Sequence, residues 1–404
     1  MAERDGISHR CVMPPTWPNR LLLVLLPSTV VLLFFHSLRT TNVRPAIVAP
    51  LDTFPSAEPE PEPRILLVSG FFPLSKSKHP MSDYQYWLER FLRPITTDIY
   101  FYAPPEMEEL VRRCRGSDLP ITVDTSYASP FDIPPLKGLR EPYEAMHAQD
   151  RESFRHSAEL YAVWNAKPFF LDNAVQMLNA STYDYAFWND AGSFRSDHRY
   201  TRWPHPARIR QLWREASALT GERTEDLLFW PLTGLPHASM RNWKEEDGPV
   251  DNEVSEGSFF GGSPSMVAWW RRVFYAYHDH YLRRGLFVGK DQTLINAILL
   301  LFPSRIISVW LGDPDAPAHV GLLPVVDQGA LGNCGAEWFY YQFWLASEEE
   351  QDAMRELWEA NARWSWTWWK ERQKCRVTRV SALTDLLRHR FGPDWRPPLH
   401  TIEP

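Results

Sequence analysis

One ten-residue run, from Tyr183 to Gly192, limits the folds open to this chain. It is aromatic and apolar as far as Trp188 and then changes abruptly to Asn189 and Asp190. A carboxylate at the carboxyl end of a buried strand, followed by a tight turn, is where open α/β sheets bind ligands. Asp190 could instead form an Asx turn or cap the next element. The run therefore predicts a buried strand ending at Asp190, with a candidate ligand site at that end.

Other apolar runs of strand character alternate with helical patterns between residues 64 and 310. Within the helical stretch 151–178, Pro168 is expected to open a second segment directly after Lys167. The alternation indicates an α/β fold with a mainly parallel mixed sheet flanked by helices. Besides the run above, strands are predicted at 64–70, 98–102, 121–123, 227–230, 258–260 and 306–310, and helices at 82–91, 106–113, 264–281 and 293–301.

Length and composition allow one large globular domain. Of the 404 residues, 44% are hydrophobic and 23% charged, which is typical of a packed protein. The net charge of -7, without a long basic block, argues against nucleic acid as a partner. We expect one domain over residues 64–345, followed by a Trp-rich helical extension at 346–404.

The four cysteines, Cys11, Cys114, Cys334 and Cys375, exclude two classes of site. No pair has the spacing of metal ligands, and the chain is too long for so few cysteines to form a disulfide scaffold. One bridge among the last three is possible, and the sequence does not select the partners.

An apolar segment near the start predicts a membrane anchor. Leu21 to Leu38 reads LLLVLLPSTVVLLFFHSL between Arg20 and Arg39. At 1.5 Å a residue it reaches roughly 27 Å, enough for a thin bilayer such as that of the endoplasmic reticulum. A cleaved signal peptide is the alternative, but the run is long for one and no small-residue cleavage site follows. We expect a cytosolic tail at 1–20 and a signal anchor at 21–38.

A proline-rich stalk is predicted at 39–63, because proline repeated this often favours an extended spacer. Acidic residues alternate with prolines towards its end. This layout is typical of a single-pass type II membrane protein of the Golgi or endoplasmic reticulum, with its folded part in the lumen. The sequon at Asn179 would be glycosylated only in that case.

Four short motifs, in this order, resemble the HtrL-like (WlaTC/HtrL) family of glycosyltransferases. They cover parts of residues 65–310 and read VSGFF at 68–72, YAVWNAKPFF at 161–170, FWNDAG at 187–192 and FFGG at 259–262. The resemblance implies a GT-A-like nucleotide-sugar fold, a nucleotide-sugar donor such as a UDP-sugar, and Mn²⁺ or Mg²⁺. Many such enzymes carry Asp-x-Asp where this chain has Trp188-Asn189-Asp190, so the first carboxylate is missing.

Glycosyl transfer needs the nucleoside diphosphate to leave as an anion, which a hard cation with oxygen ligands stabilises. Asp190 is the candidate metal ligand, and His319, which comes later in the sequence, could complete the metal shell. Asp291 and Gln292 open a helix, where they could contact sugar hydroxyls or supply a general base. Asp291 could instead simply offset the helix dipole.

The remaining candidates would contact the nucleotide or the sugar, and each also has a plain structural interpretation. The aromatic residues could flank the base or sit in the core, and the glycines could admit a ligand or form a turn. These candidates are Phe71, Phe72, Lys167 for a phosphate, Trp188, Asn189 for the ribose, Gly261 and Gly262.

The sequence predicts a type II glycosyltransferase that acts on a glycan or glycoconjugate acceptor. The alternative is a membrane-anchored glycan-binding or scaffolding protein that keeps the fold without transfer chemistry. A hydrolase with paired carboxylates is a weaker option. The many tryptophans between Trp338 and Trp369 could stack on acceptor sugars, although the sequence favours a role in covering the sheet or lying near the bilayer.

Overall fold

The computed structural model describes residues 61–316, 334–362 and 375–402. These residues belong to one compact unit that spans Pro61–Pro404. The predicted tail and anchor, nearly all of the predicted stalk, and His319 lie outside the described residues. Among the helices of the described part, none is long and apolar enough to cross a membrane.

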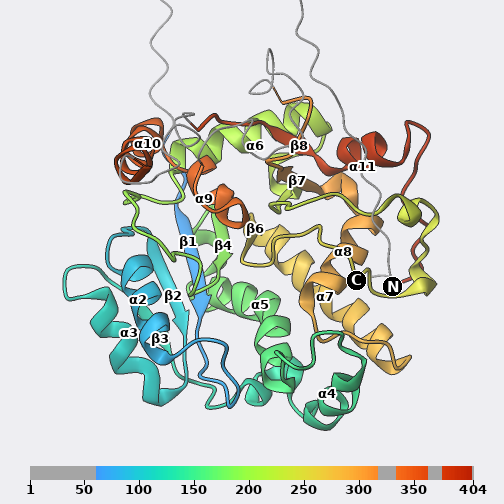
Figure 1. Cartoon of the computed structure of the whole chain (residues 1–404), viewed down its shortest axis with the longest axis horizontal. Coiled ribbons are helices and arrows are strands. Elements are labelled where there is room, and N and C mark those ends of the chain that lie inside the picture. Colours follow the sequence, from blue (N-terminus) through green and yellow to red (C-terminus); the bar gives the residue numbers. More distant parts are fainter. Residues whose placement is uncertain (1–60, 317–333, 363–374, 403–404) are drawn as a thin grey trace, which may run out of the picture. The chain divides into compact units, whose positions relative to one another are not determined.

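The described residues form one mixed sheet in the order β3-β2-β1-β4-β6-β5-β7-β8 (Figure 1). Strands β1 to β5 and β7 run in one direction, while β6 and β8 pair antiparallel with their neighbours. The predicted α/β class and the mostly parallel sheet are therefore confirmed. The strands are β1 Ile65–Gly70, β2 Asp98–Tyr102, β3 Thr122–Asp124, β4 Tyr185–Asn189, β5 Leu228–Phe229, β6 Phe259–Gly262, β7 Ile306–Val309 and β8 Val380–Ala382.

Helices cover both faces of the sheet because side chains alternate between its faces along each strand. In β1, Leu66 and Val68 pack towards α4, α5, α7, α8 and α11, and Leu67 packs towards α2, α3, α6 and α9. The helices are α2 Met81–Leu92, α3 Glu108–Arg115, α4 Arg140–Met146, α5 Ala158–Met177, α6 Pro206–Thr220, α7 Pro264–Arg283, α8 Asp291–Leu301, α9 Tyr340–Trp344, α10 Glu348–Ala362 and α11 Leu383–Phe391.

The strand order reverses beside β1. From β1 the chain passes to β2 and β3 on one side, and then crosses back through α5 to β4 on the other side. β1 and β4 are parallel, so their carboxyl ends meet at the same edge of the sheet. Open α/β sheets bind ligands in the crevice at such a switch point.

The prediction of a helix break at Pro168 is wrong. α5 runs from Ala158 to Met177 with Pro168 inside it, and it begins where the Ser157 hydroxyl accepts a hydrogen bond from the Leu160 amide. Proline removes one backbone bond, but α5 is buried on most of its surface, and that packing keeps it continuous. Lys167 therefore lies in the middle of a helix, not at its start.

Gly261 and Gly262 were expected either to admit a ligand or to form a turn between a strand and a helix, and the structure places them in neither position. Both residues lie inside β6 and are buried. A Cβ on Gly261 would lie 2.1 Å from the Ala186 carbonyl oxygen, and one on Gly262 would lie 2.7 Å from that of Leu227. The glycines therefore permit close packing of β6 against its neighbours.

The C-terminal residues add to the same sheet. β8 pairs antiparallel with β7, and a disulfide joins Cys334 to Cys375, while Cys114 is free and buried. Residues 346–404, which the sequence separated as an extension, thus contribute an edge strand and α11 to the compact unit. In Figure 1, α2 and α3 lie at the left, and β7, β8 and α11 lie at the upper right.

Candidate functional site

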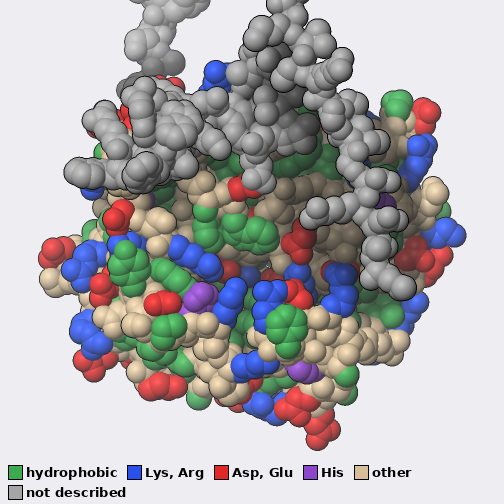
Figure 2. Space-filling view, in the orientation of Figure 1, with side chains coloured by type: hydrophobic (Ala, Val, Ile, Leu, Met, Phe, Trp, Pro, Cys, Tyr) green, Lys and Arg blue, Asp and Glu red, His purple; other side chains and the backbone are tan. Residues whose placement is uncertain are grey.

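A cavity of about 360 Å³ opens at the carboxyl ends of β1 and β4. Its volume lies within the usual range of small-molecule sites, roughly 300–1,000 Å³. Figure 2 shows basic and acidic side chains close together across the middle of one face of the molecule. The cavity lining includes Gly70–Phe72 at the end of β1, Asp190–Ser193 after β4, Lys167 of α5, Asp291 and Gln292 of α8, and Glu256–Ser258 before β6.

Lys167 holds two carboxylates together at the base of this cavity. Its Nζ lies 3.2 Å from Asp190 Oδ1 and 3.2 Å from Asp291 Oδ2, and donates a hydrogen bond to the Gly257 carbonyl. The Lys167 side chain is only 5% exposed. Burial alone would lower the pKa of Lys167, but the two carboxylates outweigh it and raise that pKa. The lysine is therefore charged at neutral pH.

Asp190 faces the cavity from the turn after β4. Its backbone N–H donates to the Ser258 carbonyl, which fixes the turn, while Oδ1 accepts a hydrogen bond of 2.6 Å from the Trp188 indole. The carboxylate thus contacts Lys167 and Trp188, and its side chain remains 33% exposed. One carboxylate of the cluster is therefore accessible from the cavity.

Asp291 is the buried member of the pair. Its Oδ1 accepts a hydrogen bond of 2.9 Å from the Gln292 amide, whereas Oδ2 accepts none from the described residues and has the Lys167 ion pair at 3.2 Å. Burial raises the pKa of Asp291, which the positive charge of Lys167 opposes. A buried oxygen without a hydrogen bond at a cavity wall has room for a further partner.

Glu256 also lines the cavity, and the sequence reasoning missed it. The side chain is 1% exposed and accepts hydrogen bonds from the Ser258 amide and hydroxyl. Burial, together with the nearby Asp190 charge, raises the pKa of Glu256 to about 8, although the hydrogen bonds from Ser258 oppose the rise. Because β6 is antiparallel to β4, residues before β6 reach the same sheet edge as residues after β4. The signal in the sequence that could have identified Glu256 was an acidic residue just before the FFGG motif.

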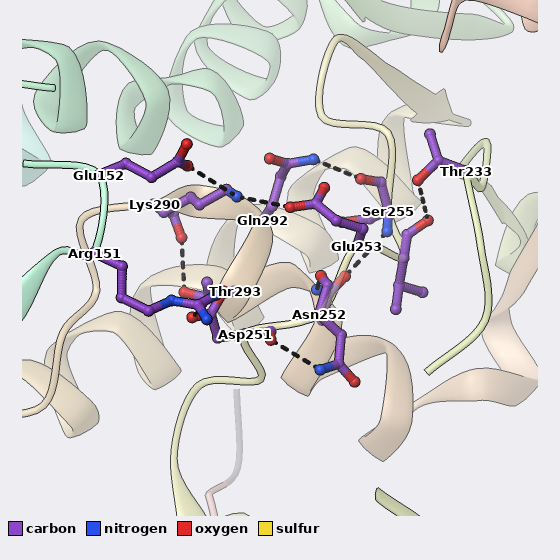
Figure 3. Close-up of polar contacts among 12 residues, drawn as sticks. Arg151, Glu152, Thr233, Asp251, Asn252, Glu253, Ser255, Lys290, Gln292 and Thr293 are labelled. Atoms are coloured by element: carbon purple, nitrogen blue, oxygen red, sulfur yellow. Dashed lines mark hydrogen bonds and ion pairs between the residues drawn. The ribbon is translucent and has the colours of Figure 1, made fainter. Parts of the chain in front are cut away.

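A polar network fixes the start of α8 against the loop before β6. Gln292 Nε2 donates a hydrogen bond of 2.7 Å to the Ser255 carbonyl, so the amide is used in holding this loop. Lys290 lies 3.2 Å from Glu253 and 3.8 Å from Glu152, between the two acids (Figure 3). These contacts position the neighbouring residues Asp291 and Glu256 relative to each other.

The structure brings most of the predicted residues to this cavity. Phe71 packs against Tyr84 with a ring separation of 4.9 Å, and Phe72 stacks on Phe170 of α5. Both rings are buried, so they combine a core role with a place in the lining. The predicted residues that line the cavity are Phe71, Phe72, Lys167, Trp188, Asp190, Asp291 and Gln292.

Three predicted residues do not line the cavity. Asn189 is buried at the end of β4, where its Nδ2 donates to the Asp190 carbonyl and its Oδ1 accepts from the Ser193 hydroxyl. Gly261 and Gly262 are covered by the strands beside β6. The expected ribose contact of Asn189 and the expected glycine wall therefore have no counterpart in this cavity.

The carboxylates fit a metal site only in part. Within the described ranges, no group of three or more His, Cys, Asp or Glu side chains is arranged to hold a metal ion. Mg²⁺ is commonly held by one or two carboxylates together with substrate phosphates. The accessible carboxylate of Asp190 fits a site of that kind that a ligand completes, while the Asp291 oxygen behind it is buried and paired with Lys167.

In comparisons with known proteins, no family model and no curated protein matches this chain. The resemblance to HtrL-like glycosyltransferases therefore stays a prediction from the motifs.

Proposed function

We propose that the protein is a glycosyltransferase that takes a sugar from a nucleotide-sugar donor in the cavity between β1 and β4. The observation that carries the proposal is the cluster of Lys167, Asp190 and Asp291 at the switch point of the sheet. The motif resemblance supports the finer proposal of a GT-A-like fold. Titratable side chains shifted from their usual pKa and gathered in a cleft support a functional role.

The charge balance of the cluster supports a role for a divalent cation. Two carboxylates surround one ammonium, so the cluster carries one net negative charge when both acids are ionised. A diphosphate beside it would be repelled unless a cation lay between them. Asp190 would hold Mn²⁺ or Mg²⁺, which when bound stabilises negative charge on the diphosphate.

The other residues would orient the reactants and keep water out. Lys167 fixes the orientation of Asp190, and Phe71 and Tyr84 form an apolar wall suited to a nucleobase. In the transfer, an acceptor oxygen bonds to the anomeric carbon and the bond from that carbon to the diphosphate breaks, its electron pair leaving with the diphosphate. Asp291 would take the hydroxyl proton, and Glu256, whose pKa is raised to about 8, would donate a hydrogen bond to the donor in its protonated form.

We place this activity in the lumen of the Golgi or endoplasmic reticulum, behind a type II anchor. A disulfide such as Cys334–Cys375 is typical of oxidising compartments. Asn179, the residue of the sequon, is exposed. Both observations support a lumenal location.

Sugar-nucleotide turnover tests the proposal. Purified protein incubated with a panel of sugar nucleotides and Mn²⁺ should release the nucleoside diphosphate from at least one of them. Asp190→Asn should lower that rate by roughly 10³-fold, about 4 kcal/mol of transition-state stabilisation. Asp118→Asn, at an exposed aspartate of the α3–β3 connection, is the matched control. Equal rates in Asp190→Asn and the wild type would remove Asp190 from the mechanism.

A glycan-binding or scaffolding protein is the second candidate. Trp188, which stands where many such enzymes have the first carboxylate, favours this second candidate. Its indole donates a hydrogen bond to Asp190 Oδ1, which is also paired with Lys167, so that oxygen already has two partners. Thermal shift with UDP, with and without Mn²⁺, separates the two candidates. A shift with glycans and none with nucleotides would support the second.

A further inference from the structure

A second cavity, of about 650 Å³, adjoins the first. The two cavities share part of their lining, so a ligand in one would lie next to a ligand in the other. The shared residues are Trp164, Ser193, Arg195, Trp338 and Phe339. Neither the motifs nor the proposed donor site accounts for this second space.

Aromatic and hydrogen-bonding side chains alternate in the lining of the second cavity. Trp338, 39% exposed, and Trp358 present flat apolar surfaces, while Gln342, His198 and Arg195 bring polar groups. Sites for small molecules combine aromatic walls with a few placed polar groups in this way. The ring of a sugar has the same two characters, an apolar C–H face and a rim of hydroxyls.

The wall of this cavity is fixed to the turn that carries Asp190. Gln342 of α9 donates a hydrogen bond of 3.1 Å to the Ser193 carbonyl. Arg195 Nε donates to the Gly192 carbonyl, and its guanidinium lies 5.5 Å from the centre of the Phe339 ring. The Cys334–Cys375 disulfide holds the start of the same wall. The second cavity is thus built onto the candidate donor site.

We propose that the second cavity binds the carbohydrate acceptor. This rests on the proposed function, because a transferase must bring an acceptor hydroxyl next to the donor sugar, and the second cavity borders the candidate donor site. The aromatic faces of Trp338 and Trp358 would carry the sugar ring, and Arg195 and Gln342 would bind its hydroxyls.

Filling the second cavity tests the proposal while leaving the donor site intact. Ala336 is exposed and lines the second cavity but not the first, so Ala336→Trp should block it without disturbing the core. Ala207→Trp, at an exposed alanine of α6, adds the same side chain elsewhere. Trp358→Phe is a second variant, which reduces the aromatic surface that lines the second cavity. Unchanged thermal transitions establish that each variant is folded.

The first probe is a set of p-nitrophenyl glycosides of glucose, galactose, mannose, xylose and N-acetylglucosamine, whose binding is measured by saturation-transfer NMR. The second probe is UDP with Mn²⁺, whose binding is measured by the shift of the thermal transition. We expect at least one glycoside to bind the wild type and Ala207→Trp, and its Kd to rise at least tenfold in Ala336→Trp. The UDP shift should be the same in the wild type and in all three variants.

Equal glycoside binding by Ala336→Trp and the wild type would overturn the acceptor site, as would binding of UDP without binding of any glycoside. No UDP shift in the wild type would overturn the proposed function, and with it the acceptor role, whatever the glycosides do. Failure of the acceptor site and failure of the proposed function are therefore detected with different probes.

Discussion

Two buried glutamates of this protein have opposite electrostatics. Glu245, 5% exposed, accepts hydrogen bonds from the Tyr277 hydroxyl and from the amide and hydroxyl of Thr401. Burial alone would raise the pKa of Glu245, but these bonds outweigh it and lower that pKa. Glu256, 1% exposed, has hydrogen-bond donors only from Ser258 among the described residues, and its pKa rises to about 8.

The difference separates a structural carboxylate from a candidate functional one. The partners of Glu245 come from α7 and from the C-terminal segment, so the ionised carboxylate joins the two. Glu256 faces a cavity that Asp190 and Asp291 also line, and the positive charge of Lys167 lowers its pKa by less than burial raises it. Buried charge with few partners is costly unless a ligand completes the site, and that imbalance marks the region between β1 and β4.

Removing the cation of the cavity should have the largest effect on stability. Lys167→Met leaves two carboxylates without their shared partner, and a buried pair broken in this way typically costs about 3–5 kcal/mol. Urea unfolding at pH 7 measures the loss, and Lys137→Met, at an exposed lysine, is the control. A decrease of less than about 1 kcal/mol in the free energy of unfolding would mean that the charges of this cluster are exposed to solvent.

The structural carboxylate should matter for stability and not for the ligand. Glu245→Gln weakens charge-assisted bonds to Tyr277 and Thr401, with an expected cost of about 2–3 kcal/mol in the free energy of unfolding. The shift of the thermal transition by UDP and Mn²⁺ should keep its wild-type size. Glu246→Gln, at the exposed neighbour, is the matched control. A variant that folds but loses the UDP shift would erase the distinction between the two glutamates.

Glu256, the candidate functional carboxylate, should instead destabilise the folded protein as the pH rises. The folded pKa of Glu256, about 8, exceeds its unfolded value of 4.5, so the unfolded chain releases this proton first. Its contribution to stability is present below pH 4.5 and is lost as pH rises through about 8. Glu256→Gln lacks this titration.

Relative to the wild type, Glu256→Gln should gain stability steadily between those two pH values, by up to about 1.4 kcal/mol for each pH unit. Unfolding titrations of both proteins across that range measure the gain, and titrating groups that lie far from Glu256 cancel in the difference. A constant difference at every pH would show that Glu256 ionises normally.

The sequence predicted the strand that ends at Asp190 and the helix that begins at Asp291, because strand and helix ends have local signals. The carboxyl-end rule for parallel strands then placed Asp190 at the correct edge of the sheet. Lys167 was chosen for a wrong reason, as a helix start, yet its position inside α5 directs its side chain between the two acids.

What the sequence could not supply depends on strand direction and on distant pairing. Nothing local shows that β6 runs antiparallel, and that direction is what brings Glu256 to the cavity. β8 has three residues, too few for a periodic pattern, and the pairing of Cys334 with Cys375 spans 41 residues. The second cavity arises because α9 packs against the turn after β4.

A crystal structure of the protein grown with UDP and Mn²⁺ tests the central claim most directly. The account predicts electron density for the diphosphate in the cavity between β1 and β4, with the metal ion bound to Asp190. Density for UDP at another place, with the Lys167–Asp190 pair unchanged and the cavity filled only by water, would contradict it.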